Sequence, residues 1–168
     1  MNSKFLIFGL ALCTLLEVSF ARAVDEFIEF TPRQWSGSEN AGLRSNDQTG
    51  TGYTRADGDF DGDGKQDHAA LKVQASGGSS FRLVVTLSTA SGQAYTVKSG
   101  SNIQAVGIET IKPGRYKTAC AKGAGPRDGG CLPEVVLLHD GLSLFTFESG
   151  SMLIYWEEGR FKEVAIAD

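Results

Sequence analysis

Four aspartates within residues 58–67 form the part of this chain with the clearest capacity for chemistry. Counted from the first of them, the carboxylates stand at positions 1, 3, 5 and 9 of a loop: Asp59, Asp61, Asp63 and Asp67. Calcium is a hard cation that takes six to eight oxygen ligands, and alternate side chains of a tight loop converge on one point. Four clustered carboxylates without a cation would repel one another. The spacing therefore predicts a calcium site.

Two further positions complete the predicted site. Gly64, at position 6, permits a sharp turn, and the backbone carbonyl of Lys65, at position 7, is expected to supply another oxygen. A helix-loop-helix calcium site needs a glutamate at position 12, where this chain has Ala70, and the residues that follow alternate as in a strand. The site is therefore not an EF-hand. The alternative interpretation is an acidic turn that is merely solvated.

The same residues resemble a known family of calcium loops. Residues 58–67 are similar to the nine-residue loop of FG-GAP and VCBS-type repeats, whose pattern GD-x-N/D-GDG-x-x-D leads into a strand. The resemblance covers about 20 residues in a single copy. It implies a structural metal that braces propeller-like β-blades, with the four aspartates as side-chain ligands.

Other catalytic groups are scarce. The chain has two histidines, His68 beside the acidic loop and His139 beside Asp140, and both are expected to be surface residues. They do not form a usual zinc site, and neither a phosphate-binding loop nor a dinucleotide fingerprint is present. Glu157 and Glu158 precede a glycine and are expected to form a solvated turn. These observations predict that the protein is not an enzyme.

The N-terminus predicts export. Lys4 precedes a short apolar run over residues 5–16, and Ala21-Arg22-Ala23 supplies the small residues that signal peptidase requires. The run is too short to span a bilayer, which needs about 20 residues, so a retained anchor is the weaker alternative. Cys13 follows Leu12, where a lipoprotein signal needs a small residue. We expect residues 1–23 to be a cleaved signal peptide and residues 24–168 to form one periplasmic or secreted domain.

The cysteines and the charge agree with that compartment. Cys120 and Cys131 remain after cleavage, and an even pair in an exported chain predicts a disulfide that closes the glycine-rich segment between them. A catalytic thiol is the less favoured interpretation. The whole chain has a net charge of −4, which argues against nucleic-acid binding, and no segment is expected to embed it in a membrane.

The rest of the chain predicts an all-β fold. Short apolar runs rich in β-branched and aromatic residues recur every 8–12 residues, and residues 81–88 alternate most clearly. We expect about nine or ten short antiparallel strands in a sandwich or a partial propeller. Turns at Ser91-Gly92 and Asp140-Gly141 are expected to close hairpins. Residues 31–35 predict one turn of helix, and residues 37–52 predict a long polar loop.

A rigid exported scaffold without a catalytic set suits binding. Small, disulfide-closed, β-rich proteins resemble the immunity partners of cell-wall-degrading toxins delivered by type VI secretion. The resemblance implies a protein inhibitor that occludes a peptidoglycan amidase or similar toxin. Its loops would enter the toxin's groove, among them residues 76–80 and the segment Ser99, Gly100, Ser101 and Asn102. The alternative is a calcium-braced carbohydrate or cell-surface binding module, with Tyr155, Trp156 and Phe161 as stacking residues.

Overall fold

The first of two large sheets is built around one long strand. The computed structural model describes residues 26–89, 92–123 and 132–166. In it β3 (Asp67–Gln74) pairs on one edge with both β1 (Phe27–Glu29) and β2 (Arg55–Gly58), and on the other with β4 (Phe81–Thr86). The outermost strand, β5 (Ala94–Gly100), pairs with β4. The sequence alternation of β3 and β4 places every second side chain in the interior, as period-2 patterning requires.

The remaining strands form a second large sheet and a small one. The second sheet has the order β11-β10-β9-β6, and its strands are β6 (Val106–Ile111), β9 (Gly141–Thr146), β10 (Ser151–Glu157) and β11 (Arg160–Ile166). The small sheet consists of β7 (Gly114–Lys117) and β8 (Glu134–Leu137). Each pairing between these described strands is antiparallel, so the predicted all-β fold is confirmed.

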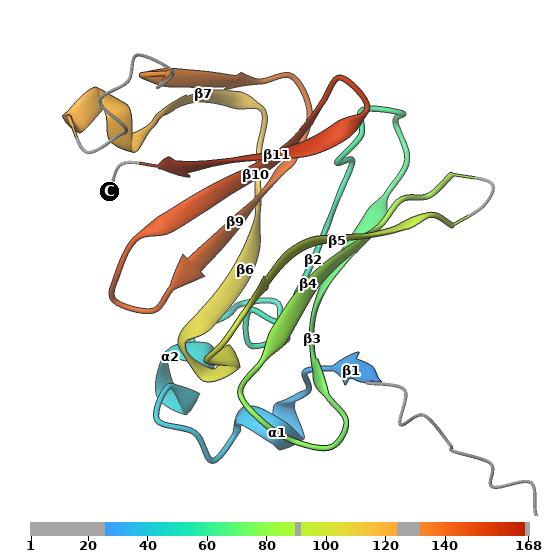
Figure 1. Ribbon diagram of the computed structural model, residues 1–168, viewed down its shortest axis with the longest axis vertical. Helices are drawn as coiled ribbons and strands as arrows, with labels where there is room; N and C mark the ends of the chain where they lie inside the picture. The colour runs from blue at the N-terminus through green and yellow to red at the C-terminus, as the bar shows by residue number, and fades with distance from the viewer. Residues whose placement is uncertain (1–25, 90–91, 124–131, 167–168) are drawn as a thin grey trace, which may run out of the picture.

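The two large sheets bury the main core between them, and they lie on opposite sides of the molecule (Figure 1). Leu71 and Leu83 of the first sheet belong to the same buried cluster as Leu142 and Ile154 of the second. A second cluster lies beyond β10, where Leu153 packs with side chains of β8. Because β10 is buried on both of its faces, it connects the sandwich core to the small sheet.

Four short helical segments complete the described chain. The predicted turn of helix is α1 (Pro32–Trp35), and a second turn, α2 (Ala41–Arg44), lies inside the segment that we expected to be a loop. Two 3-10 turns are η1 (Ile103–Ala105) and η2 (Ala119–Lys122). In this described part of the chain, no helix is long and apolar enough to cross a membrane.

Two local predictions are wrong. The Asp140-Gly141 dipeptide does not close a hairpin, because β8 pairs with β7 while β9 pairs with β6 and β10. It carries the chain from the small sheet to the second large sheet instead. Ser99 and Gly100 do not lie in a loop, since β5 continues through them against Arg82 and Phe81.

A fully buried arginine joins the segments that lead into β2 and β6. Arg44 is 0% exposed, and its guanidinium donates hydrogen bonds to the carbonyl oxygens of Gly52 (2.7 Å), Ile103 (2.9 Å) and Val106 (2.7 Å). Its Cζ atom also lies 5.1 Å and 5.0 Å from two ring centroids, those of Phe30 and Phe147. Burial lowers the pKa of Arg44 to about 10, so the group stays charged at neutral pH.

Replacing Arg44 by Met should destabilise the fold by about 3–5 kcal/mol, because each abandoned buried carbonyl costs about 1–3 kcal/mol. Arg44→Lys should restore only part of this, since an ammonium cannot reproduce the planar fork of donors. Urea unfolding followed by tryptophan fluorescence measures the loss. The matched control is Arg33→Met, an exposed arginine of α1. An equal effect of Arg33→Met and Arg44→Met would contradict the prediction.

Candidate functional site

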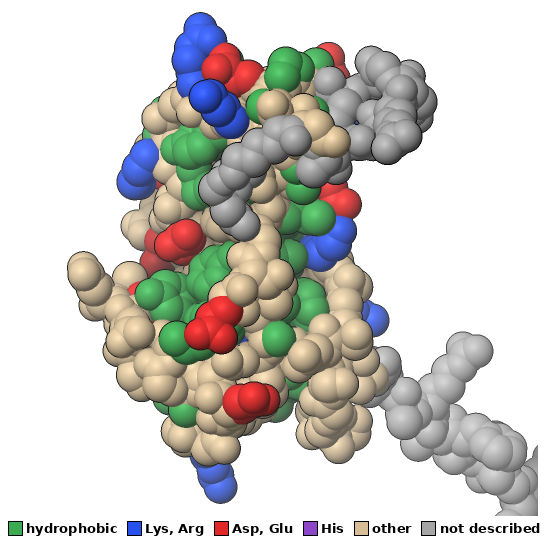
Figure 2. All heavy atoms as spheres, turned by 90° about the vertical axis from the view of Figure 1, so that its left-hand side faces the viewer, with side chains coloured by type: hydrophobic (Ala, Val, Ile, Leu, Met, Phe, Trp, Pro, Cys, Tyr) green, Lys and Arg blue, Asp and Glu red, His purple; other side chains and the backbone are tan. Residues whose placement is uncertain are grey.

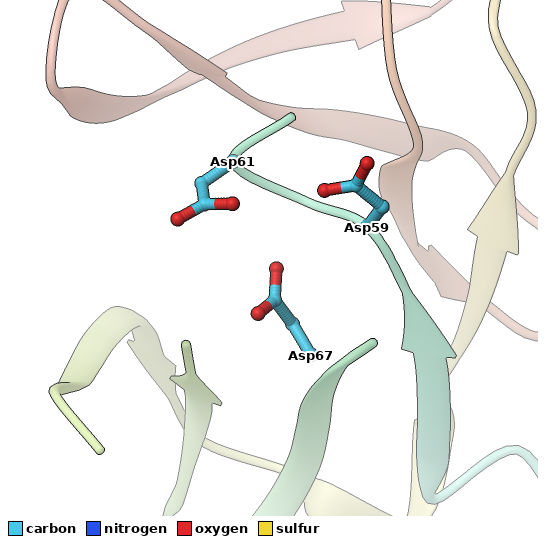
Figure 3. A group of neighbouring side chains, drawn as sticks. All are labelled: Asp59, Asp61 and Asp67. Atoms are coloured by element: carbon cyan, nitrogen blue, oxygen red, sulfur yellow. The ribbon is translucent and has the colours of Figure 1, made fainter. Parts of the chain in front are cut away.

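The candidate site lies where β2 ends and β3 begins. Carboxylate oxygens of Asp59, Asp61 and Asp67 all lie within 4.8 Å of one another. Figure 3 shows these three side chains directed into one shared space, two from the loop and one from the start of β3. Because β2 and β3 pair antiparallel up to Gly58 and Asp67, the sheet itself brings the two ends of the loop together. Three of the four predicted carboxylate ligands are therefore gathered at one point.

The loop is shaped by its own backbone amides. The Asp59 carboxylate accepts hydrogen bonds from the N–H groups of Gly62 (2.9 Å) and Gly64 (3.0 Å), and Asp61 accepts one from Asp63 (3.1 Å). Both glycines have a positive φ, +80° and +81°, which disfavours any side chain there. The predicted role of Gly64 in a sharp turn is confirmed, and the same requirement applies to Gly62.

Asp67 is the buried carboxylate of the site. It is 0% exposed, and its two oxygens accept hydrogen bonds from the backbone N–H groups of Phe60 (2.8 Å) and Ser88 (2.7 Å). Phe60 is itself buried in the main core. Asp67 therefore fastens the loop to the core and to the segment that follows β4.

Burial and neighbouring charges both act on Asp61. Partial burial raises the pKa of Asp61, and the nearby carboxylates of Asp67, Asp63 and Asp59 raise it further. A cation at this point would relieve both effects, because it favours the charged form of each carboxylate. The donor set, which consists of hard oxygens, suits Ca²⁺ or Mg²⁺ rather than a softer metal.

Asp63 lies outside the group of three. Its carboxylate accepts hydrogen bonds from the backbone N–H (2.9 Å) and the Nζ (2.8 Å) of Lys65, and the side-chain hydrogen bond lowers the pKa of Asp63. The structure thus gives this carboxylate a cationic neighbour within the loop. The ligand roles predicted for Asp63 and for the carbonyl of Lys65 stay predictions.

The loop is held against the opposite half of the molecule. The backbone N–H of Asp140 donates to the carbonyl of Asp59 (3.1 Å), while the Asp140 carboxylate accepts from the Asp59 N–H (3.2 Å). A Cβ atom at Gly62 would lie 2.8 Å from the Cδ2 atom of His139, and one at Gly58 would lie 2.9 Å from an oxygen of Asp140. The segment that we expected to be a hairpin turn is therefore a wall of the site.

The other predicted site residues have different outcomes. Cys120 lies in η2 and is disulfide-bonded, whereas Cys131 lies outside the described residues, so the pairing stays a prediction. The proposed signal peptide, residues 1–23, also lies outside them. Ser99, Gly100, Ser101 and Asn102 are exposed at the end of β5 and just before η1, and nothing tests a role in binding.

Asp47 lines a pocket beside β2, and the sequence did not predict this role for it. The Asp47 carboxylate accepts hydrogen bonds from the backbone and hydroxyl of Thr49 (3.0 and 2.7 Å), the hydroxyl of Thr51 (2.9 Å) and the backbone N–H of Tyr53 (3.1 Å). Although burial acts in the opposite direction, these hydrogen bonds lower the pKa of Asp47 to about 2. An Asp-x-Thr-x-Thr spacing is the signal that could have predicted this turn.

Known proteins add no identification. No protein-family model matches the chain, and neither a curated protein nor a solved structure shows significant similarity to it. The resemblance of residues 58–67 to FG-GAP and VCBS-type loops remains one of a short motif.

Substitutions of Asp67 and Asp61 should have different effects on stability in the absence of metal. With a chelator present, Asp67→Asn should lower stability by about 1–3 kcal/mol, because an amide cannot accept from both Phe60 and Ser88. Asp61→Asn should leave stability unchanged or raise it, since it removes one of several repelling charges. Thermal unfolding in chelator measures both variants. Equal losses in the two would contradict the distinction.

Proposed function

We propose that this is an exported, non-catalytic binding protein whose scaffold is stabilised by one calcium ion and whose partner is another protein. The observation that carries the proposal is the convergence of three carboxylates at the junction of β2 and β3, against a wall supplied by the β8–β9 connection. An ion at this junction would hold the loop whose Asp59 is hydrogen-bonded to Asp140 of the other half of the chain. The ion would stabilise the fold and take no part in a reaction.

The position of the cluster supports a structural ion. Asp67 is buried and bonded to core backbone, and Asp59 contacts Asp140 from the far half of the chain. A cation that binds only the folded state stabilises it in proportion to its concentration over its dissociation constant. Calcium would therefore act on the fold as a whole.

An exposed apolar strand supports a protein partner. Leu132, Val136 and Leu138 are 60%, 50% and 85% exposed, and the last two lie on or directly after β8. Among the described strands β8 pairs only with β7, so its other edge offers backbone groups to an incoming strand. Clustered exposed apolar residues at a strand edge are typical of protein interaction sites. An inhibitor of a secreted toxin, as in immunity proteins, is the specific form of this proposal.

A carbohydrate-binding module is the less supported alternative. Tyr155 is buried, and Trp156 and Phe161 pack partly buried against the main core, with Trp156 and Phe161 in a T-shaped contact at 4.8 Å. Stacking on a sugar requires an exposed ring face. These aromatic residues are engaged with the core instead.

The histidines give no support to an enzyme. His68 Nδ1 lies 2.6 Å from an oxygen of Asp57, and both side chains are largely exposed. In the described part of the chain, no serine, threonine or cysteine hydroxyl or thiol hydrogen-bonds His68, so the pair lacks a nucleophile to activate. We therefore propose that the pair is a surface ion pair.

Calcium should bind at one site with a dissociation constant of about 10⁻⁴ M or tighter and should raise the melting temperature. Isothermal titration calorimetry and thermal unfolding measure these. Asp61→Asn and Asp67→Asn should abolish both responses. The control Asp57→Asn removes a carboxylate from β2 outside the cluster and should retain them. Absence of heat and of a thermal shift in the unaltered protein would refute the calcium part of the proposal.

The partner should depend on the β8 surface. A protein captured from the cell envelope or medium and then purified should bind at least about tenfold more weakly to Leu138→Ser and Val136→Thr, because buried apolar anchors dominate such interfaces. Ile28→Thr is the control, since Ile28 is an exposed apolar residue on the distant β1. Equal binding by all three variants would exclude the β8 surface. Recovery of glycan binding alone would favour the carbohydrate module.

A further inference from the structure

Two adjoining cavities lie on the side of the molecule where β2 and β6 meet. The larger, about 460 Å³, is lined mainly by residues with polar side chains, among them Asp57 of β2 and Thr110 of β6. The smaller, about 300 Å³, is lined by Leu43, Asn46, Phe145 and Phe147. Tyr53 and Glu109 line both, so the two cavities adjoin at these residues, and together they are called the groove. On the face that includes α2 and β9, Figure 2 shows apolar side chains at the surface beside acidic ones.

The aromatic part of the groove is held in a strained arrangement. Tyr53 has a φ of +58°, which is uncommon for a residue with a side chain. Its N–H bonds the Asp47 carboxylate and its carbonyl accepts from the Ile108 N–H (2.8 Å), so its backbone is fixed on both sides. Strained backbone of this kind concentrates at binding sites.

A glycine makes room for the rings. Gly107 pairs with Phe145, and a Cβ atom at position 107 would lie 2.5 Å from the Phe145 ring and 2.9 Å from Tyr53. The ring centroids of Tyr53 and Phe145 are 5.3 Å apart, and those of Phe145 and Phe147 are 5.4 Å apart. The rings therefore form one rigid apolar wall.

Glu109 is the uncompensated charge of the groove. Asp47 is saturated by hydrogen bonds, Asp57 pairs with His68, and Arg55 pairs with Glu29. Glu109 is exposed on β6, and no hydrogen bond or ion pair joins it to any residue that the structure describes. A carboxylate thus stands without a cation at the rim of an apolar wall.

This combination selects one ligand chemistry. Lysine and arginine each carry an apolar stem and a cationic head group. The stem packs on apolar surface, while the head group binds a carboxylate. A purely apolar side chain would desolvate Glu109 without compensation. A sugar ring needs a broad flat face, whereas these three rings stand nearly perpendicular, at 83°, 69° and 86°. Because Arg44 already lies against the Phe147 ring, the incoming head belongs at Glu109 and the stem on the rings.

We propose that the groove formed by Tyr53, Phe145, Phe147 and Glu109 binds a basic side chain of the partner protein. The inference rests on the proposed protein-binding function and specifies a second contact, apart from β8, that the partner must satisfy. The partner surface is therefore expected to be basic, which complements the net charge of −4.

Nuclear magnetic resonance titration tests the groove without a known partner. The probe is N-acetyl-arginine amide added to the isotope-labelled protein, with N-acetyl-citrulline amide as its uncharged match. The arginine probe should cause saturable shifts in the amides of Tyr53, Glu109 and Phe145, and the citrulline probe should bind about tenfold more weakly. Added salt should weaken binding of the arginine probe, because salt screens the charge of the exposed Glu109.

Paired variants separate charge at the groove from charge elsewhere. Glu109→Gln should weaken binding of the arginine probe about tenfold. The control Glu39→Gln removes an exposed glutamate outside both cavities and should leave this binding unchanged. Equal binding of citrulline, unchanged binding by Glu109→Gln, or tighter binding of chitotriose at these amides would overturn the inference. Such results would leave the calcium response and the β8 variants untouched, so they would not by themselves refute the proposed function.

Discussion

The buried guanidinium of Arg44 is the constraint on which the functional side of this molecule depends. It holds the carbonyl of Gly52, just before β2, beside those of Ile103 and Val106, which bracket the start of β6. Arg44 is 0% exposed, and both of its terminal nitrogens donate to these carbonyls, so the backbone segments cannot separate without leaving a buried charge unpaired. The groove follows directly from this arrangement, and the acidic loop follows at the far end of β2.

The two parts of the molecule that concern binding are built differently. The acidic loop is defined by spacing along the chain, because residues 59–67 begin and end on neighbouring positions of an antiparallel pair. The groove is assembled from three separate stretches of sequence: the turn that holds Asp47 and Tyr53, the strand with Glu109, and the strand with Phe145. A metal loop can be formed by residues close together in the sequence, whereas a surface that recognises a partner can combine residues from several elements.

This difference explains what could be predicted from the sequence. Strands such as β3 and β4 alternate cleanly, and the aspartate spacing marks a loop whose ends must meet, so both were predictable. Arg44 was not, because an isolated arginine in a polar segment carries no local sign that it will be buried. The same holds for β2, whose four residues become a strand only through pairing with β3, and for Asp140-Gly141, whose turn chemistry is used to reach Asp59 instead of to close a hairpin.

The contact between Asp59 and Asp140 also has a consequence for the order of folding. These residues are separated by 81 positions, yet each donates a backbone N–H to the other. The acidic loop therefore lacks one wall until the strands after residue 140 have been synthesised and docked. Cation affinity should thus develop late, as a property of the finished chain and not of its first half, since contacts between distant positions form slowly. Metal occupancy would then report completed folding, which distinguishes finished molecules from partly folded ones.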